Sequence, residues 1–218
     1  VPSELKLMWN QTGLPWLKKN GGAKNTFFSR VLKVYGSTES KLTDELADLL
    51  NKSNPTVATY AKLGEVQLRI TAKGKTLEKA KELISPLEDE LLHRIGKKCY
   101  GSDNESLTSV VLALLEKRKE TLAIAESCTG GGLGASLTSI PGASKVFKGG
   151  VIVYSNSMKE KMLEISPNII NKYGAVSAQT VQAMAKGAKA KFDSDWAVAI
   201  SGVAGPDGGT KVTPVGYV

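Results

Sequence analysis

The second half of the chain repeats short apolar strands and helices in alternation, and this order constrains the fold more than any other feature. Three segments are runs of small and β-branched apolar residues that end in glycine or small polar residues, which is typical of buried strands. These segments are 121–127, 149–155 and 194–202. Helical patterns at 104–119, 157–165 and 177–191 lie between or beside them, the first beginning at Asn104 or Ser106. The alternation predicts an α/β domain whose sheet is covered by helices on both faces. A fourth strand is expected in 211–218.

The first half predicts a smaller α+β unit of a different kind. The patterns indicate a strand at 29–36, a helix at 37–54, a hairpin at 56–74 with Leu63-Gly64 at its turn, and a helix at 76–101 with a kink at Pro86. The order β-α-β-β-α predicts a sheet with helices packed on it. Residues 1–27 contain Pro2, Pro15 and several glycines, which favour a tail or linker anchored by two tryptophans.

Composition describes a globular chain with 41% hydrophobic and 23% charged residues. Residues 1–100 hold 17 Lys/Arg and 11 Asp/Glu, against 12 and 10 in residues 101–218. This excess could attract an anion, but the lysines are interleaved with acids, so a solvated surface is the favoured interpretation. The sequence contains neither an apolar run of membrane-spanning length nor a signal-peptide pattern, so no transmembrane helix or leader is expected. Two isolated cysteines, Cys99 and Cys128, favour a reducing, cytoplasmic location.

Several kinds of catalytic site are disfavoured by the residues present. Residues 101–218 contain no histidine and one cysteine, so metal binding and a Ser-His-Asp triad are not expected there. His93 stands in the lysine-rich helical segment, where a structural role is favoured. Cys128 has no general base nearby in the sequence and is expected to be a small buried apolar residue.

Three strand ends offer a place for a ligand: AESCTGGG, VYSNS and AISGVAGPDGG. Ligands of α/β sheets bind at the carboxyl ends of strands. A helix that begins near Thr129 would offer free N–H groups to a phosphate or carboxylate. The alternative is that the glycines only form a tight turn from strand to helix, and the spacing does not match a dinucleotide fingerprint or a P-loop.

Ser144, Tyr154 and Lys159 form a candidate site for nucleophilic chemistry without histidine. A lysine can act as a base when burial lowers its pKa, and a serine becomes nucleophilic by giving its proton to such a base. On spacing alone, the favoured interpretation is a strand with polar flanks. The three residues become a stronger candidate only in the context of the neighbouring motifs.

Five short motifs follow one another in the second half of the chain: AESCTGG, PGAS, GGVIVYSN, YGAVS, and AISGVAGPDGG with PVG. Their sequences and their order resemble the C-terminal domain of the CinA family of competence/damage-inducible proteins. Residues 29–101 are similar to its KH-like middle domain, and VPSELKLM resembles the end of a molybdopterin-binding-like first domain. The expected organisation is therefore a tail at 1–27, a KH-like domain at 28–101 and a C-terminal domain at 102–218, in a chain that is a fragment.

The resemblance implies an amidohydrolase that converts nicotinamide mononucleotide and water into nicotinate mononucleotide and ammonia. It places Ser144 as the nucleophile, Tyr154 as a proton relay or a holder of the serine, and Lys159 as the base. Its implied substrate-binding residues are Glu126, Ser127, Thr129, Gly130, Gly131, Asn156, Ser201, Gly202 and Gly205. It implies a homo-oligomer, most simply a dimer, and neither a metal nor a cofactor is expected. A Gly-Asp-Arg element of the family lies outside the 218 residues, which argues against full activity of this segment alone.

Two other functions stay open at the level of sequence. Residues 29–101 lack the G-x-x-G loop with which KH domains clamp nucleic acid, and their aromatic residues are few, so a spacer or dimerisation role is favoured over RNA binding. A nucleic-acid-associated or inactive scaffold linked to competence or DNA damage is the other alternative.

Overall fold

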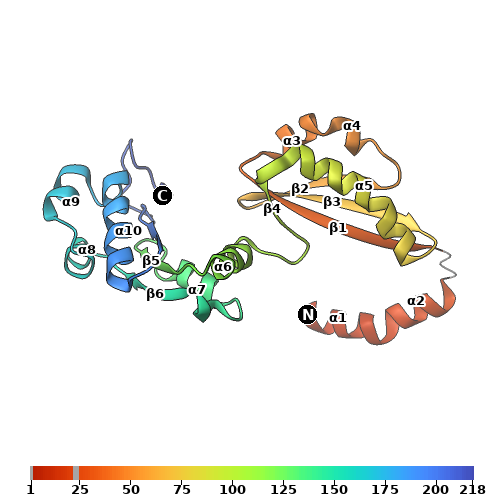
Figure 1. Ribbon diagram of the computed structural model, residues 1–218, viewed down its shortest axis with the longest axis horizontal. Coiled ribbons are helices and arrows are strands. Elements are labelled where there is room, and N and C mark those ends of the chain that lie inside the picture. The colour runs from red at the N-terminus through yellow and green to blue at the C-terminus, as the bar shows by residue number, and fades with distance from the viewer. Residues whose placement is uncertain (1, 22–24) are drawn as a thin grey trace. The chain divides into compact units, whose positions relative to one another are not determined.

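The computed structural model describes residues 2–21 and 25–218, and its contacts divide the chain into two units after Glu105. Each unit has its own sheet and its own core, and each is described by itself (Figure 1). No helix within the described residues is long and apolar enough to cross a membrane.

The first described residues are helical rather than linker-like. α1 (Pro2–Met8), a π-helical turn η1 (Trp9–Gly13) and α2 (Leu14–Asn20) follow one another without interruption. Trp9 is 49% exposed and Trp16 is 62% exposed. The expectation that the two tryptophans act as anchors is therefore wrong, because about half of Trp9 and most of Trp16 are exposed and neither belongs to a buried core cluster of the described residues.

The first unit contains a four-stranded antiparallel sheet with the strand order β2-β3-β1-β4. Its strands are β1 (Thr26–Tyr35), β2 (Thr56–Lys62), β3 (Glu65–Gly74) and β4 (Cys99–Ser102). The predicted hairpin of β2 and β3 is confirmed, with Leu63 and Gly64 between the strands. Gly64 has φ +78°, a conformation that favours glycine over residues with a side chain.

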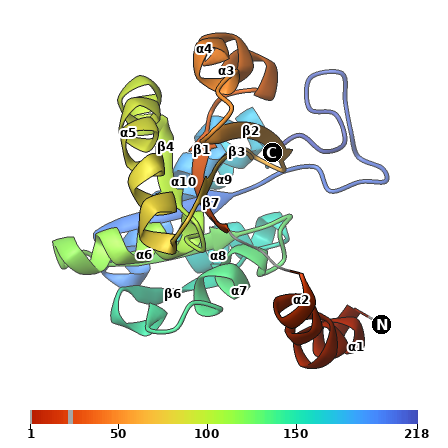
Figure 2. The same cartoon turned by 90° about the vertical axis from the view of Figure 1, so that its right-hand side faces the viewer.

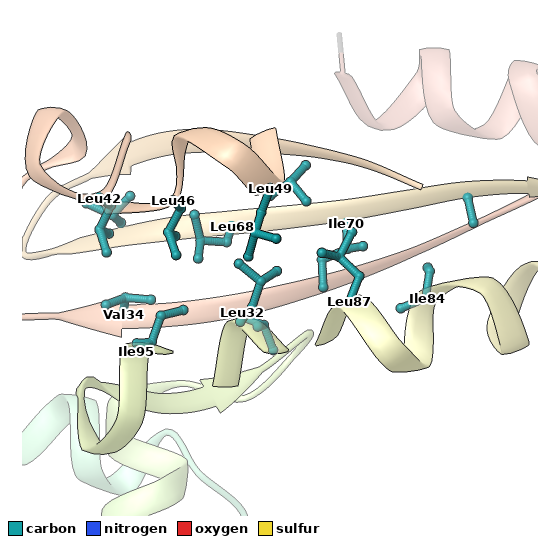
Figure 3. Close-up of a cluster of buried hydrophobic side chains, with 14 of the residues drawn as sticks. Leu32, Val34, Leu42, Leu46, Leu49, Leu68, Ile70, Ile84, Leu87 and Ile95 are labelled. Carbon is teal, nitrogen blue, oxygen red and sulfur yellow. The ribbon is translucent and has the colours of Figure 1, made fainter. Parts of the chain in front are cut away.

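Helices α3 (Glu39–Glu45), α4 (Ala47–Leu50) and α5 (Leu77–Ile95) cover one face of this sheet (Figure 1). The core between them is made of leucine, isoleucine and valine side chains (Figure 3). α3 and α5 begin where Thr38 and Thr76 accept hydrogen bonds from backbone N–H groups. The alternating burial along β3 shows that side chains of the other parity point away from the core.

The helix predicted for 76–101 is shorter than expected. It ends at Ile95, and Gly96 with φ +59° reverses the chain into a 3₁₀ turn, η2 (Gly96–Lys98), that leads to β4. β4 pairs with β1, with Ser102 opposite Leu32. Pairing with an open sheet edge is a tertiary interaction, so the helical pattern of the preceding residues does not predict it.

The second unit contains three parallel strands in the order β6-β5-β7. They are β5 (Leu122–Glu126), β6 (Phe147–Ile152) and β7 (Trp196–Ile200), so the three predicted strands are confirmed. The helices are α6 (Leu107–Arg118), α7 (Gly132–Thr138), α8 (Asn156–Leu163), α9 (Pro167–Tyr173) and α10 (Ala178–Phe192). A 3₁₀ turn, η3 (Ala143–Lys145), precedes β6. Ser106 caps α6.

The central strand β5 separates two cores. Leu122 and Ile124 pack in a cluster with residues of α6 and α7, whereas Ala125 packs in a cluster with residues of α8, α9 and α10. Helices therefore cover both faces of the sheet, as the apolar strands predict.

The segment after β7 runs as a long irregular loop (Figure 2). The strand expected in 211–218 is not observed among the described residues. Instead, Val203 N–H donates to the Tyr217 carbonyl at 2.9 Å, and Gly216 N–H donates to the Val203 carbonyl at 2.8 Å. These bonds use backbone groups that a sheet neighbour would need, and Pro214 has no N–H to offer to one.

Candidate active site

The carboxyl ends of the three parallel strands meet at one edge of the sheet. In the register of the sheet, Glu126 lies opposite Ile152 on one side and opposite Ile200 on the other. Ser127 N–H continues the pairing by donating to the Ile200 carbonyl at 3.0 Å. Residues that follow these strands therefore share one edge, where ligands of α/β sheets bind.

The alternation of side chains along β5 sends Glu126 and Ser127 to opposite faces of the sheet. Glu126 continues the parity of Leu122 and Ile124 and points toward α7. Ser127 continues the parity of Ala125, toward the face that carries α8. Both are almost fully buried, with exposed fractions of 1% and 6%.

Lys159 contacts Ser127 on the face of the sheet that carries α8. α8 begins after Ser155, whose hydroxyl accepts a hydrogen bond from Met158 N–H, and Lys159 follows in its first turn. Lys159 Nζ lies 3.1 Å from Ser127 Oγ and donates to the Tyr154 main-chain carbonyl, also at 3.1 Å. The lysine is only 2% exposed. A buried amine thus stands within hydrogen-bond distance of a buried hydroxyl.

Burial lowers the pKa of Lys159 below that of a free lysine. Its hydrogen-bond partners within the described residues are a hydroxyl and a carbonyl, and no carboxylate pairs with it. A neutral amine in this position can accept the serine proton, which is the arrangement of an activated serine nucleophile with a lysine base.

The glycine-rich turn after β5 is organised by the Glu126 carboxylate. Its Oε2 atom accepts hydrogen bonds from Thr129 Oγ1 at 2.6 Å, Gly131 N–H at 3.1 Å and Leu133 N–H at 3.0 Å. Its Oε1 atom accepts one from Gly134 N–H at 2.8 Å. Burial alone would raise the pKa of Glu126, but these four hydrogen bonds outweigh it, so that the pKa lies below its usual value.

The protein's own carboxylate occupies the helix end of the predicted anion site. Gly131, Leu133 and Gly134 N–H groups donate to Glu126, and Gly130 and Gly132 N–H groups donate to main-chain carbonyls within the turn. Among the described residues, only the first two N–H groups of the turn, those of Cys128 and Thr129, are left without a partner. The roles of Glu126 and Gly131 as direct ligands of the substrate are corrected to structural roles, because their polar groups satisfy each other. Thr129 and Gly130 stay exposed at the turn.

Ser144 lies away from this site. It stands in η3, before β6 begins, whereas Tyr154 and Lys159 follow the end of that strand. The six residues of β6 span about 20 Å at a rise of about 3.3 Å per residue. Ser144 is exposed at the rim of a surface cavity of about 480 Å³ and forms no hydrogen bond with Lys159 or Tyr154 in the described structure. The expected convergence of Ser144 on Lys159 is wrong.

Tyr154 joins the site through its main chain. Its side chain is 68% exposed, and its hydroxyl has no hydrogen-bond partner among the described residues. Asn156, the first residue of α8, is also exposed. The side chains of Tyr154 and Asn156 are therefore exposed to solvent at the carboxyl edge, where they could contact a ligand.

The residues after β7 border the same edge. Ser201 is 3% exposed, and its hydroxyl donates to the Ala175 carbonyl at 2.9 Å. Gly202 packs so closely that a Cβ there would lie 2.7 Å from the Tyr217 carbonyl oxygen and 3.1 Å from Cys128 Sγ. Gly205 has φ +80°. Of the predicted residues, Ser127 and Lys159 are joined directly, by the hydrogen bond between Nζ and Oγ. The sequence did not predict this pairing, because it placed Ser144 beside the lysine.

Fold and site together define an α/β protein with a serine–lysine pair at the carboxyl edge of a parallel sheet. The family model described as "CinA C-terminal domain" matches residues 104–218, and the model "Damage-inducible protein CinA KH domain" matches residues 29–101. The first match alone covers more than half of the chain. The chain therefore belongs to the CinA family.

Curated relatives match over the whole of this chain. A CinA-like protein of Prochlorococcus marinus (strain MIT 9313) is 56% identical over 218 residues, which are 100% of this chain and 51% of that protein. A CinA-like protein of Parasynechococcus marenigrum (strain WH8102) is 52% identical over 218 residues, which are 100% of this chain and 52% of that protein. The chain spans about half the length of these curated relatives.

Among solved structures, a competence-damaged protein (CinA) superfamily protein from Escherichia coli is 36% identical to this chain. The match has a TM-score of 0.49 and covers 50% of this chain and 64% of the other.

Proposed function

We propose that this chain carries the active site of an amidohydrolase in which Ser127 is the nucleophile and Lys159 is the base. The observation that carries the proposal is the 3.1 Å distance between Lys159 Nζ and Ser127 Oγ, in a place where the lysine is 2% exposed and its pKa is lowered. The proposed substrate is nicotinamide mononucleotide, which the family resemblance implies, and the products are nicotinate mononucleotide and ammonia.

In the proposed first step, Ser127 Oγ attacks the carboxamide carbon while Lys159 Nζ takes the hydroxyl proton. The C–N bond then breaks, and the proton passes from Lys159 to the leaving nitrogen, which departs as ammonia. The nicotinoyl group stays on Ser127 as an ester. Water, deprotonated by Lys159, hydrolyses this ester and restores the serine.

The turn after Ser127 offers a place for the negative charge of the tetrahedral intermediate. The N–H groups of Cys128 and Thr129 have no hydrogen-bond partner within the described residues, unlike those of the three glycines that follow. A donor directly after the nucleophile is a common source of oxyanion stabilisation, and one such donor is worth about 3–4 kcal/mol. In this proposal, the Glu126 carboxylate holds the turn, and the exposed Tyr154 hydroxyl is free to bond the substrate.

The test compares two serines in the full-length protein, with ammonia release from nicotinamide mononucleotide as the readout. Ser127→Ala is expected to lower kcat by about three orders of magnitude or more, because it removes the nucleophile. Ser144→Ala is the matched control and is expected to change kcat less than about twofold, because this serine lies before β6. An active Ser127→Ala protein would overturn the proposal, as would a loss of activity confined to Ser144→Ala.

A further inference from the structure

Within the described residues of the first unit, α3, α4 and α5 pack on one face of the sheet, and no helix of this unit packs on the other face. Leu32, Leu68 and Ile70 point into the core and are at most 1% exposed. Residues of the opposite parity on β1, β2 and β3 point to the other side. We call this side the open face and define it by Lys33, Tyr35, Tyr60, Lys62, Arg69 and Lys73.

The open face combines aromatic rings with positive charge. Tyr60 is 41% exposed and Tyr35 is 49% exposed. The guanidinium carbon of Arg69 lies 4.8 Å from the centre of the Tyr60 ring. In the register of the sheet, Tyr60 lies opposite Gln67, and Gln67 lies opposite Lys33 on the next strand. The rings and cations therefore form one continuous surface across three strands.

The acidic residue on this face, Glu65, is hydrogen-bonded by neutral side chains. Glu65 accepts hydrogen bonds from the Tyr100 hydroxyl and from Gln67 Nε2, and the bond from Tyr100 lowers the pKa of this carboxyl. The nearby charges of Lys33 and Lys62 also lower the pKa of this carboxyl. Among the described residues, none of the four cations forms an ion pair with a carboxylate. Lys33 Nζ donates a hydrogen bond to the Glu105 main-chain carbonyl and keeps its charge. The charges of the open face are thus complementary to a polyanion.

We propose that the open face binds single-stranded nucleic acid. Unpaired bases can stack on Tyr60 and Tyr35, and the cations that surround these rings can contact the phosphates. A duplex does not fit this chemistry, because its bases already stack on one another. The binding mode differs from that of a G-x-x-G loop, which residues 29–101 lack. It also revises the spacer role favoured by the sequence, because the fold gathers scattered tyrosines and lysines on one side.

The test is fluorescence anisotropy of the full chain with labelled oligouridylate and oligothymidylate of about twelve nucleotides. Both strands are expected to bind, and comparison of the two separates RNA from DNA preference. The four cations predict a slope of about −3 in a plot of log affinity against log salt concentration. Tyr60→Ala is expected to weaken binding about tenfold, whereas Tyr60→Phe keeps the ring and is expected to bind as the wild type.

Arg69→Ala has a charge-matched control in Lys81→Ala. Lys81 is exposed on α5, which packs on the covered face. Arg69→Ala is expected to lower the salt slope by about 0.7, and Lys81→Ala is expected to leave it unchanged. Equal losses in the two variants would overturn the proposal, since binding would then follow net charge alone. An absence of binding at low salt would also overturn it, as would a Tyr60→Ala variant that binds normally but loses self-association in sedimentation.

Discussion

Lys159 and Ser127 are 32 residues apart in the chain, yet Nζ and Oγ lie 3.1 Å apart in the fold. The distance follows from two local structures. Ser127 comes directly after the central strand β5, and Lys159 lies in the first turn of the helix that follows the neighbouring strand β6. Two parallel neighbours bring their carboxyl ends together, so the residues that follow them become partners.

Replacing Lys159 by methionine should change how stability depends on pH. The folded pKa of Lys159 lies below the value of about 10.4 expected in the unfolded chain. Between these two values the unfolded chain binds more protons, so the contribution of this group to stability rises with pH and is complete above about 10.4. We expect the free energy of unfolding of the wild type, relative to Lys159→Met, to increase from neutral to alkaline pH in urea titrations. A difference that is constant with pH would contradict a lowered pKa.

The same lysine predicts the acid limb of the pH–rate profile. If neutral Lys159 is the base, kcat/KM falls about tenfold per pH unit below its folded pKa, because the protonated amine cannot accept the serine proton. The inflection should lie below the pKa of about 10.4 of an ordinary lysine. Tyr154→Phe serves as the control, because the Tyr154 contact to Lys159 comes from the main-chain carbonyl. The Tyr154→Phe variant should show the inflection of kcat/KM at the same pH as the wild type, even if kcat/KM itself changes. An inflection at a different pH would show that the tyrosine side chain contributes to the acid limb.

The fold of the second unit could be predicted largely from the sequence, because β5, β6 and β7 are local apolar runs. The position of Ser144 was predictable by the same reasoning. Ser144 precedes the strand that Tyr154 follows, so the length of β6, about 20 Å, lies between Ser144 and the carboxyl edge of the sheet. Ser127 follows the preceding strand, β5, and therefore lies at the same edge of the sheet as Lys159.

Other features depend on tertiary structure. The glycine-rich turn indicates free N–H groups, and only the packed structure shows that Glu126 accepts hydrogen bonds from them. In the same way, β4 forms because β1 presents an open edge to it, with Ser102 opposite Leu32. A sequence pattern describes one segment at a time, and these contacts join segments that are distant in the chain.

Gly150→Ala should destabilise the second unit. A Cβ at this position would lie 2.2 Å from Ile124 Cγ1 and 3.0 Å from the Ile124 carbonyl oxygen, and Ile124 is only 3% exposed. Movement of the Ile124 side chain into the cavity of about 260 Å³ that it lines would relieve only part of the overlap, because the carbonyl belongs to the backbone of the central strand. We expect the free energy of unfolding to fall by about 1–3 kcal/mol, measured by urea denaturation.

Gly132→Ala is the matched control for this glycine. Its nearest neighbour would be Thr129 Cβ at 3.9 Å, and it occupies the first position of α7, where alanine is favoured over glycine. The free energy of unfolding should change by less than about 1 kcal/mol. Equal losses in the two variants would show that close packing of Gly150 against Ile124 is not the cause.

Glu126→Gln should destabilise the protein and remove part of its acid sensitivity. The carboxylate accepts four hydrogen bonds, whereas a glutamine side chain turns an NH₂ group toward backbone N–H groups and leaves at least one of them unpaired. We expect a loss of about 3 kcal/mol at neutral pH in urea unfolding. The pKa of Glu126 is lowered in the folded state, so its stabilisation is complete above the unfolded value of about 4.3 and is lost as the pH falls through the folded value.

The difference between wild type and Glu126→Gln should therefore shrink as the solution is acidified. Glu116→Gln is the control, since Glu116 pairs with Lys145 at 2.6 Å on the surface, where both side chains are more than half exposed. An exposed pair of this kind contributes about 0–1 kcal/mol, because water and salt screen it. If Glu126→Gln were no more costly than Glu116→Gln, the turn after Ser127 would not depend on the Glu126 carboxylate, and another group would have to hold the Cys128 and Thr129 N–H groups in place.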